Sequence, residues 1–195
     1  MRIHYSVLIV LIFALYTRTI IEFGIFFGCI ILHEIGHLFF IKLFKQKLQR
    51  INLTIFGGQL DCYIGNVGQL KSILINSGGI IVNAILIYLA NFFDGYYQKV
   101  LINYNFLLIL FNILPIYPLD GYRILESLFS NTNVSFTFAV MSVISIIFII
   151  ALGIYSITLN SGGLIVIVIF LLIKNIERIK KKDHIILQKF IKQFS

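Results

Sequence analysis

The stretch His33-Glu34-Ile35-Gly36-His37 stands in an apolar run that extends from about Thr19 to Leu43. Ionisable side chains are costly to insert into a membrane, so three of them in five positions indicate a function. On a helix, His33 and His37 lie one turn apart on one face, with Glu34 next to them. Two imidazoles at this spacing can bind one metal ion. Histidines that only hydrogen-bond to neighbouring helices would not explain the glutamate at that offset.

The composition of the whole chain is that of a membrane protein. Of its 195 residues, 59% are hydrophobic and 12% are charged, and the mean hydropathy is +0.96. Soluble domains carry about 25% charged residues. The net charge of +8 might suggest nucleic-acid binding, but the Lys and Arg residues lie between or after apolar runs and form no basic face. We therefore expect the lipid bilayer as a partner and no nucleic acid.

The apolar runs predict an all-α polytopic membrane protein with about six transmembrane helices. A helix needs roughly 20 apolar residues to cross a ~30 Å hydrocarbon core. The six runs are approximately Val7–Tyr16, Thr19–Leu43, Leu70–Phe93, Val100–Leu114, Val134–Tyr155 and Leu159–Ile173. The fourth run meets Pro115 and Pro118, which cannot continue a helix. We expect that helix to unwind there.

A small β-hairpin is predicted between the second and third transmembrane helices. Ile51–Phe56 and Gln59–Ile64 are two runs of equal length with partial alternation, joined by Gly57-Gly58 as a two-residue turn. The pattern H-E-x-x-H on a helix is typical of zinc metalloproteases, and a protease inside a membrane must hold its substrate as an extended strand. The free edge of this hairpin could pair with such a strand. A plain connecting hairpin is the alternative reading.

Basic residues indicate the orientation, because cytoplasmic loops are enriched in Lys and Arg. With six spans and the N-terminus inside, only Arg18 and Lys99 of the 16 basic residues lie outside. This pattern predicts a multi-pass protein with both termini in the cytoplasm. Residues 1–175 form the expected membrane-embedded domain, and residues 176–195 form a basic cytoplasmic tail.

A third metal ligand is expected from another helix, since hydrolytic zinc sites commonly have three protein ligands and one water. At ~1.5 Å per residue, His33 is about 20 Å along its run and Pro115 is about 22 Å along the fourth run. The fourth helix therefore unwinds at the depth of the histidines, and Asp120 in the unwound segment can turn back to the metal. An interfacial turn aspartate in Leu119-Asp120-Gly121 is the alternative.

Three further polar residues have predicted roles near this site. Glu34 is adjacent to the ligands but off their line, so we expect it to be the general base. Asn83 in the third helix and Asn112 in the fourth are buried polar groups that need partners. They either line the site or bridge helices.

Three motifs together resemble the site-2 protease family of intramembrane zinc metalloproteases. They are His33-Glu34-Ile35-Gly36-His37, Phe56-Gly57-Gly58, and the segment 112–123, Asn-Ile-Leu-Pro-Ile-Tyr-Pro-Leu-Asp-Gly-Tyr-Arg. They occur in the family's order within residues 1–175. The compact six-span layout without a PDZ domain is similar to the subgroup of stage IV sporulation protein FB, although the tail is too short for that subgroup's CBS domain.

The resemblance implies a zinc metalloendopeptidase with one zinc ion per chain. By that resemblance His33, His37 and Asp120 bind zinc, Glu34 is catalytic and Asn112 supports the active site. The segment 78–83 keeps the Gly and Asn of a family motif, ending in Asn83, but lacks its proline. The implied activity is regulated intramembrane proteolysis in a bacterial cell membrane, as in sporulation. Its substrate would be a membrane-associated regulator, such as a pro-sigma factor, cleaved near the cytoplasmic face, with regulatory membrane proteins as further partners.

Two alternatives stay open at this point. The same protease could clear signal-peptide remnants, which are also single apolar segments. The chain could instead be a catalytically silent metal-binding or transport protein on the same scaffold. The intact Glu34 argues against a silent protein, because a pure binding site needs no base there.

Overall fold

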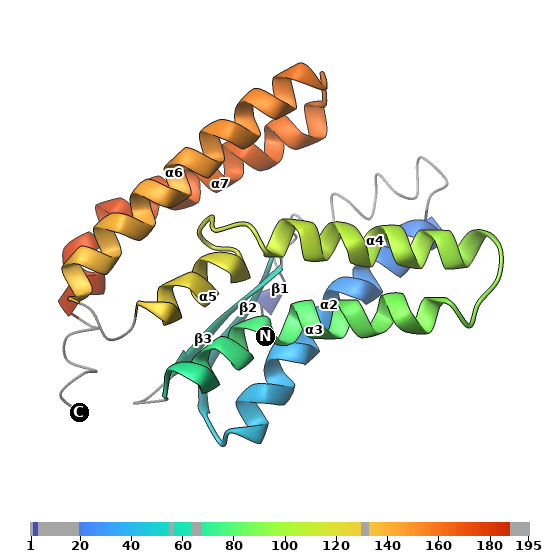
Figure 1. Cartoon of the computed structure of the whole chain (residues 1–195), viewed down its shortest axis with the longest axis horizontal. Helices are drawn as coiled ribbons and strands as arrows, with labels where there is room; N and C mark the ends of the chain where they lie inside the picture. The colour runs from blue at the N-terminus through green and yellow to red at the C-terminus, as the bar shows by residue number, and fades with distance from the viewer. Residues whose placement is uncertain (1, 4–19, 55–56, 64–67, 130–132, 188–195) are drawn as a thin grey trace. The chain divides into compact units, whose positions relative to one another are not determined.

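The computed structural model describes residues 2–3, 20–54, 57–63, 68–129 and 133–187. The chain divides into two compact units (Figure 1). Unit 1 comprises Met1–Ile64 and Ser77–Phe111, and unit 2 comprises Gly65–Asn76 and Asn112–Ser195. Each unit is described separately below.

The helices of unit 1 are α2 (Ile20–Leu43), most of α3 (Gln69–Ala90) and nearly all of α4 (Tyr96–Asn112). Helices α2 and α4 run parallel to each other and are in contact along their length. The contacts are a hydrogen bond from the Tyr96 hydroxyl to Glu22 near their N-termini, an edge-to-face pair of Phe26 and Tyr104, and a hydrogen bond of 3.3 Å from Asn105 Nδ2 to Cys29 Sγ. Cys29 is thus a buried packing residue.

Helices α2 and α3 approach so closely that only glycine fits at their crossing. A Cβ atom on Gly78 would lie 2.6 Å from the carbonyl oxygen of Gly36, and a Cβ on Gly36 would lie against the backbone of Gly78. Small residues at such crossings are typical of membrane helices, because they let the two backbones come together. Gly36 of the histidine motif therefore has a structural role.

A three-stranded sheet completes unit 1, with the order β1-β2-β3. Strand β1 (Arg2–Ile3) pairs in parallel with β2 (Lys47–Thr54), and β2 pairs antiparallel with β3 (Gly57–Tyr63). The predicted strand bounds and turn are wrong. Gly57 and Gly58 lie within β3, opposite Thr54 and Leu53, so the connection falls at residues 55–56, outside the described part of the chain.

Unit 2 contains the helices α5 (Asp120–Leu128), α6 (Val134–Thr158) and α7 (Gly162–Lys180). Helices α6 and α7 form an antiparallel hairpin (Figure 1). Its core contains Ile149 and Leu171, and both pack with Ile116 from the segment before α5. This segment is therefore anchored on the hairpin by apolar contacts.

The structure locates the break in the fourth predicted span. Helix α4 ends at Asn112, three residues before Pro115, so the predicted unwinding is confirmed and begins slightly earlier. The short helix α5 was not predicted. Asp120 is the first residue of α5. The sequence-based expectation that Asp120 lies in an unwound segment is therefore wrong. Leu119 occupies the N-cap without a side-chain cap, so no capping residue signals the start of this helix.

The described residues do not support the predicted count of six transmembrane helices. Helices α2, α3 and α6 are long and apolar enough to cross a membrane. Helix α4 has 17 residues, which span about 26 Å. Helix α7 continues past the predicted boundary at 175 and carries charged residues in its last turns. The first predicted span, Val7–Tyr16, lies outside the described residues.

The glycine contact predicts a stability difference between two substitutions in one helix. Gly36→Ala forces α2 and α3 apart and should lower the free energy of unfolding by roughly 1–3 kcal/mol. Gly28→Ala is the matched control, because a Cβ there meets nothing within 4 Å. Thermal unfolding of the purified variants in detergent measures both. Equal melting temperatures for the two variants would contradict the close helix contact.

Candidate metal centre

His33 and His37 converge on one point from the buried face of α2. They are 4% and 5% exposed, and their Nε2 atoms lie 3.3 Å apart. Two nitrogen ligands at ~2.0–2.1 Å from a tetrahedral ion lie about 3.3–3.4 Å apart, so the pair has the spacing that such an ion requires. The predicted single-face arrangement of the two histidines is confirmed.

The same face of α2 carries Glu34, which is 7% exposed. The opposite face is apolar and open, with Ile35 and Phe39 at 48% and 61% exposure. This arrangement, polar inside and apolar outside, is the one expected of a membrane helix whose functional residues face the protein interior. Glu34 is therefore next to the histidine pair in a site shielded from the lipid-facing side.

Helix α3 supports His33 through two residues one turn apart. A Cβ on Gly79 would lie against the imidazole of His33, so the absence of a side chain makes room for the ring. Asn83 is completely buried, and its Nδ2 lies 3.1 Å from His33 Nδ1. The sequence left open whether Asn83 lines the site or bridges helices. Because this contact joins α3 to a histidine of α2, Asn83 does both. The glycine one turn before it, Gly79, was noted as part of a family motif, but its role was not predicted, since only the packing shows that it makes room for His33.

Asp120 begins α5 in unit 2 and is 9% exposed. The next residue, Gly121, allows a tight turn: a Cβ there would lie 2.7 Å from the carbonyl oxygen of Leu114 and against that of Ile113. By its chemistry, the predicted set of His33, His37 and Asp120 offers two imidazoles and one carboxylate that could hold a metal ion.

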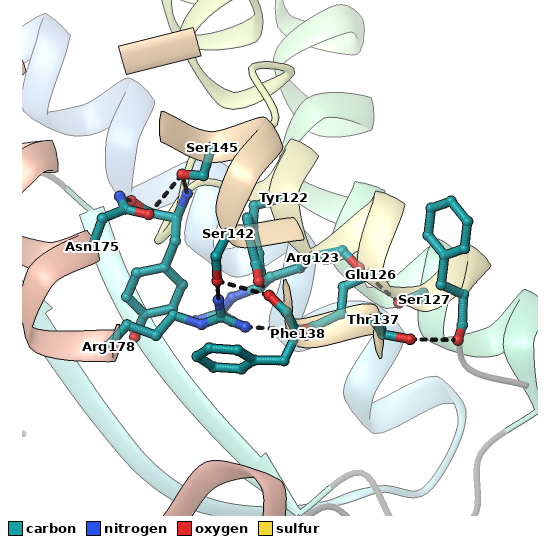
Figure 2. Close-up of polar contacts among 12 residues, drawn as sticks. Tyr122, Arg123, Glu126, Ser127, Thr137, Phe138, Ser142, Ser145, Asn175 and Arg178 are labelled. Atoms are coloured by element: carbon teal, nitrogen blue, oxygen red, sulfur yellow. Dashed lines mark hydrogen bonds and ion pairs between the residues drawn. The ribbon is translucent and has the colours of Figure 1, made fainter. Parts of the chain in front are cut away.

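A closed ring of hydrogen bonds holds the backbone three residues before Asp120. The Tyr117 amide donates to Ser145 Oγ at 3.1 Å, the Ser145 hydroxyl donates to Asn175 Oδ1 at 2.7 Å, and Asn175 Nδ2 donates to the Tyr117 carbonyl at 2.8 Å. Figure 2 shows Ser145 and Asn175 joined by one of these bonds. Side chains of α6 and α7 thus replace the backbone partners that Tyr117 loses where α4 ends.

Arg178 fixes the other side of this segment from α7. It is 6% exposed and forms an ion pair of 3.0 Å with Glu126 of α5 (Figure 2). Its guanidinium lies 4.4 Å from the ring centre of Phe138 and 4.5 Å from that of Tyr122. Such cation–π contacts help to compensate for the burial of the charge. Burial, together with the nearby Glu126 charge, raises the pKa of Tyr122, so its hydroxyl stays protonated.

Some of these residues could be inferred from the sequence and others could not. Arg178 counted only as one basic residue of the predicted cytoplasmic tail, and Ser145 and Asn175 had no motif around them. Asn112 is the last residue of α4 and half-buried, and its supporting role stays a prediction. The same holds for Gly57 and Gly58, whose place in β3 is set out above.

Comparisons with known proteins agree with this architecture. No family model matches the chain. The zinc metalloprotease MJ0392 of Methanocaldococcus jannaschii is 32% identical over 124 residues, which are 55% of this chain and 34% of that protein. The chain thus spans about a third of that relative's length. The solved site-2 protease from Methanocaldococcus jannaschii matches with a TM-score of 0.70 at 21% identity, covering 90% of this chain and 88% of the solved one. The chain therefore has a site-2 protease fold, and its composition and three apolar helices identify it as a membrane protein.

The ion pair of Arg178 with Glu126 predicts a clear effect of one substitution in α7. Arg178→Met removes this pair and the cation–π contacts of Arg178 with Phe138 and Tyr122, and it should cost about 1–3 kcal/mol of stability. The control is Lys174→Met, which removes an exposed pair with Glu177 on the same helix and should cost less than about 1 kcal/mol. Chemical unfolding in detergent compares the two. Similar losses for both variants would show that the Arg178 cluster is not a stabilising element.

Proposed function

We propose that this protein is an intramembrane zinc metalloprotease of the site-2 protease type. The observation that carries the proposal is the pair of His33 and His37 Nε2 atoms, 3.3 Å apart on the buried face of an apolar helix, with Glu34 beside them. A zinc metalloprotease as a partial relative and a site-2 protease as a structural match support the same activity.

His33, His37 and Asp120 would hold one zinc ion per chain. The donor set fits zinc, which accepts imidazole and carboxylate ligands, and the spacing of the two nitrogens fits a tetrahedral ion. Asp120 is supported as the third ligand by its burial and by the hydrogen-bonded segment that precedes it. When bound, zinc polarises the scissile carbonyl and acidifies a water molecule.

Glu34 performs the proton transfers of the proposed reaction. Its carboxylate accepts the proton of the attacking water and delivers it to the nitrogen of the departing amine. A buried carboxylate beside the ligands, but outside the ligand set, suits this role because it can exchange protons without giving up a bond to the metal. His33 and His37 are committed to the metal and cannot serve as the base.

The substrate we propose is a membrane-associated protein that enters as an extended strand. Strand β2 has neighbours on both sides, because β1 pairs with it at Asn52 and Leu53 and β3 pairs along its other edge. Among the described residues β3 therefore offers an edge for strand addition, with Gly57 and Gly58 at its start. A membrane-tethered regulator such as a pro-sigma factor is the substrate class, cleaved near the cytoplasmic face.

The proposed orientation has the N-terminus, the hairpin and the tail in the cytoplasm of a bacterial cell. The pairing of β1 with β2 supports a common side for the N-terminus and the hairpin, since the run Val7–Tyr16 and α2 would make two crossings between them. Helices α3 and α6, which are long and apolar enough to cross, and two further crossings by α4 and α7 complete the proposed six. The similarity to the sporulation subgroup, and any regulatory membrane partner, rest on the sequence resemblance alone.

General clearance of signal-peptide remnants remains the second candidate substrate role, because the proposed site acts on the same class of apolar segment. A catalytically silent metal-binding protein is the alternative from another class. Retention of Glu34 on the buried face of α2 argues against it.

Substitution of Glu34 tests the proposed chemistry. Glu34→Gln keeps the shape but cannot accept a proton, so cleavage of a co-expressed single-span substrate should fall by about 10²–10⁴-fold while zinc content stays unchanged. Immunoblotting detects the product, and metal analysis of the purified variant detects the zinc. Wild-type cleavage by Glu34→Gln would refute the mechanism, and loss of its zinc would make Glu34 a ligand.

The orientation is tested by labelling single cysteines placed at positions 99 and 181. A membrane-impermeant thiol reagent applied to whole cells should label Lys99→Cys and not Lys181→Cys, because only position 99 lies outside in the proposed topology. Permeabilised cells, in which both should react, serve as the control. External labelling of position 181 would reverse the proposed orientation of the tail.

A further inference from the structure

Asn83 has an unsatisfied atom at its contact with His33. The side chain is fully buried in α3, and its Nδ2 lies 3.1 Å from His33 Nδ1. Its Oδ1 is buried without a hydrogen-bond partner among the described residues. In this arrangement the amide oxygen makes no hydrogen bond, and a buried amide oxygen without a partner is costly.

The tautomer of His33 determines whether the amide nitrogen or the amide oxygen of Asn83 faces His33 Nδ1. If Nδ2 donates to Nδ1, the proton of the neutral imidazole is on Nε2, and Nε2 then has no lone pair for a metal. If Nδ1 carries the proton instead, it must donate, and it needs an acceptor. The oxygen and nitrogen of an asparagine amide occupy nearly the same space, so a 180° turn of the amide exchanges them without moving the helices.

We infer that Asn83 is the positioning residue of His33, with Asn83 Oδ1 accepting a hydrogen bond from His33 Nδ1–H in the metal-binding state. This bond keeps the proton on Nδ1 and leaves the Nε2 lone pair for the ion. The turn exchanges the two amide atoms, so Nδ2 then takes the position in which Oδ1 has no partner among the described residues. The inference rests on the proposed zinc site and extends it to a residue outside the ligand set.

The surroundings of His33 support a fixed ring rather than a freely turning one. Gly79 lies one turn before Asn83 on α3, and its backbone packs against the imidazole. One side of the ring is thus bounded by Gly79, and its Nδ1 edge faces Asn83. His37 Nε2 lies 3.3 Å from His33 Nε2, so the opposite edge faces the proposed metal position. Ligating histidines commonly donate their second ring nitrogen to an acceptor in this way.

Asn105 provides a matched comparison for a residue that only bridges helices. It is fully buried in α4 of the same unit, and its Nδ2 donates to Cys29 Sγ and to the Leu101 carbonyl at 2.8 Å. It contacts no histidine through these bonds. Replacing it should therefore alter stability without altering metal affinity.

Zinc affinity of the purified full-length protein in detergent tests the inference by competition with a chromophoric chelator. Asn83→Leu removes the acceptor and should weaken zinc binding by about 10–100-fold. Asn83→Asp keeps an acceptor and removes the donor, so it should bind zinc at least as tightly as the wild type. Asn105→Leu should bind zinc with wild-type affinity.

Two results would overturn the inference. One is wild-type zinc affinity in folded Asn83→Leu. The other is weaker binding by Asn83→Asp, which would show that the amide acts as a donor. The aspartate variant decides the question even where Asn83→Leu does not fold. Absence of zinc binding by the wild type would instead refute the proposed metal site itself.

Discussion

The convergence of two imidazole nitrogens inside an apolar helix is the constraint on which the rest of unit 1 depends. His33 and His37 must be buried together at 3.3 Å, and buried polar groups require partners. Helix α3 supplies them at close range, because Gly78 meets Gly36 backbone to backbone and Gly79 leaves space for the ring. Asn83 then reaches the far nitrogen of His33. Sequence features that look unrelated, two adjacent glycines and an asparagine, thus all contact the helix segment that carries the two histidines.

Unit 2 holds the chain in place where a helix ends. Where α4 stops at Asn112, backbone groups lose their helical partners, and buried backbone groups without partners are costly. Ser145 and Asn175 take both backbone groups of Tyr117, and apolar contacts of Ile116 anchor the same segment. Asp120 is therefore presented by a chain segment that two helices of its own unit hold in place.

The sequence predicted those features that local pattern controls. The spacing of His33 and His37 required only helical periodicity, and the break near Pro115 required only the geometry of proline. The strand bounds were wrong because Gly57 and Gly58 suit a turn equally well, while the pairing with Thr54 and Leu53 places them in β3. Helix α5 starts without a side-chain cap, so the sequence contains no N-cap signal from which its start could be predicted. Arg178 could not be identified as a buried cation, because its partners come from α5 and α6.

The central claim is that two imidazoles and one carboxylate bind a single zinc ion. X-ray absorption at the zinc edge of the purified protein measures the ligands directly. The account predicts two imidazole ligands and additional oxygen ligands at ~2.0–2.2 Å, with no sulfur ligand. A sulfur shell near ~2.3 Å, or only one imidazole, would contradict it.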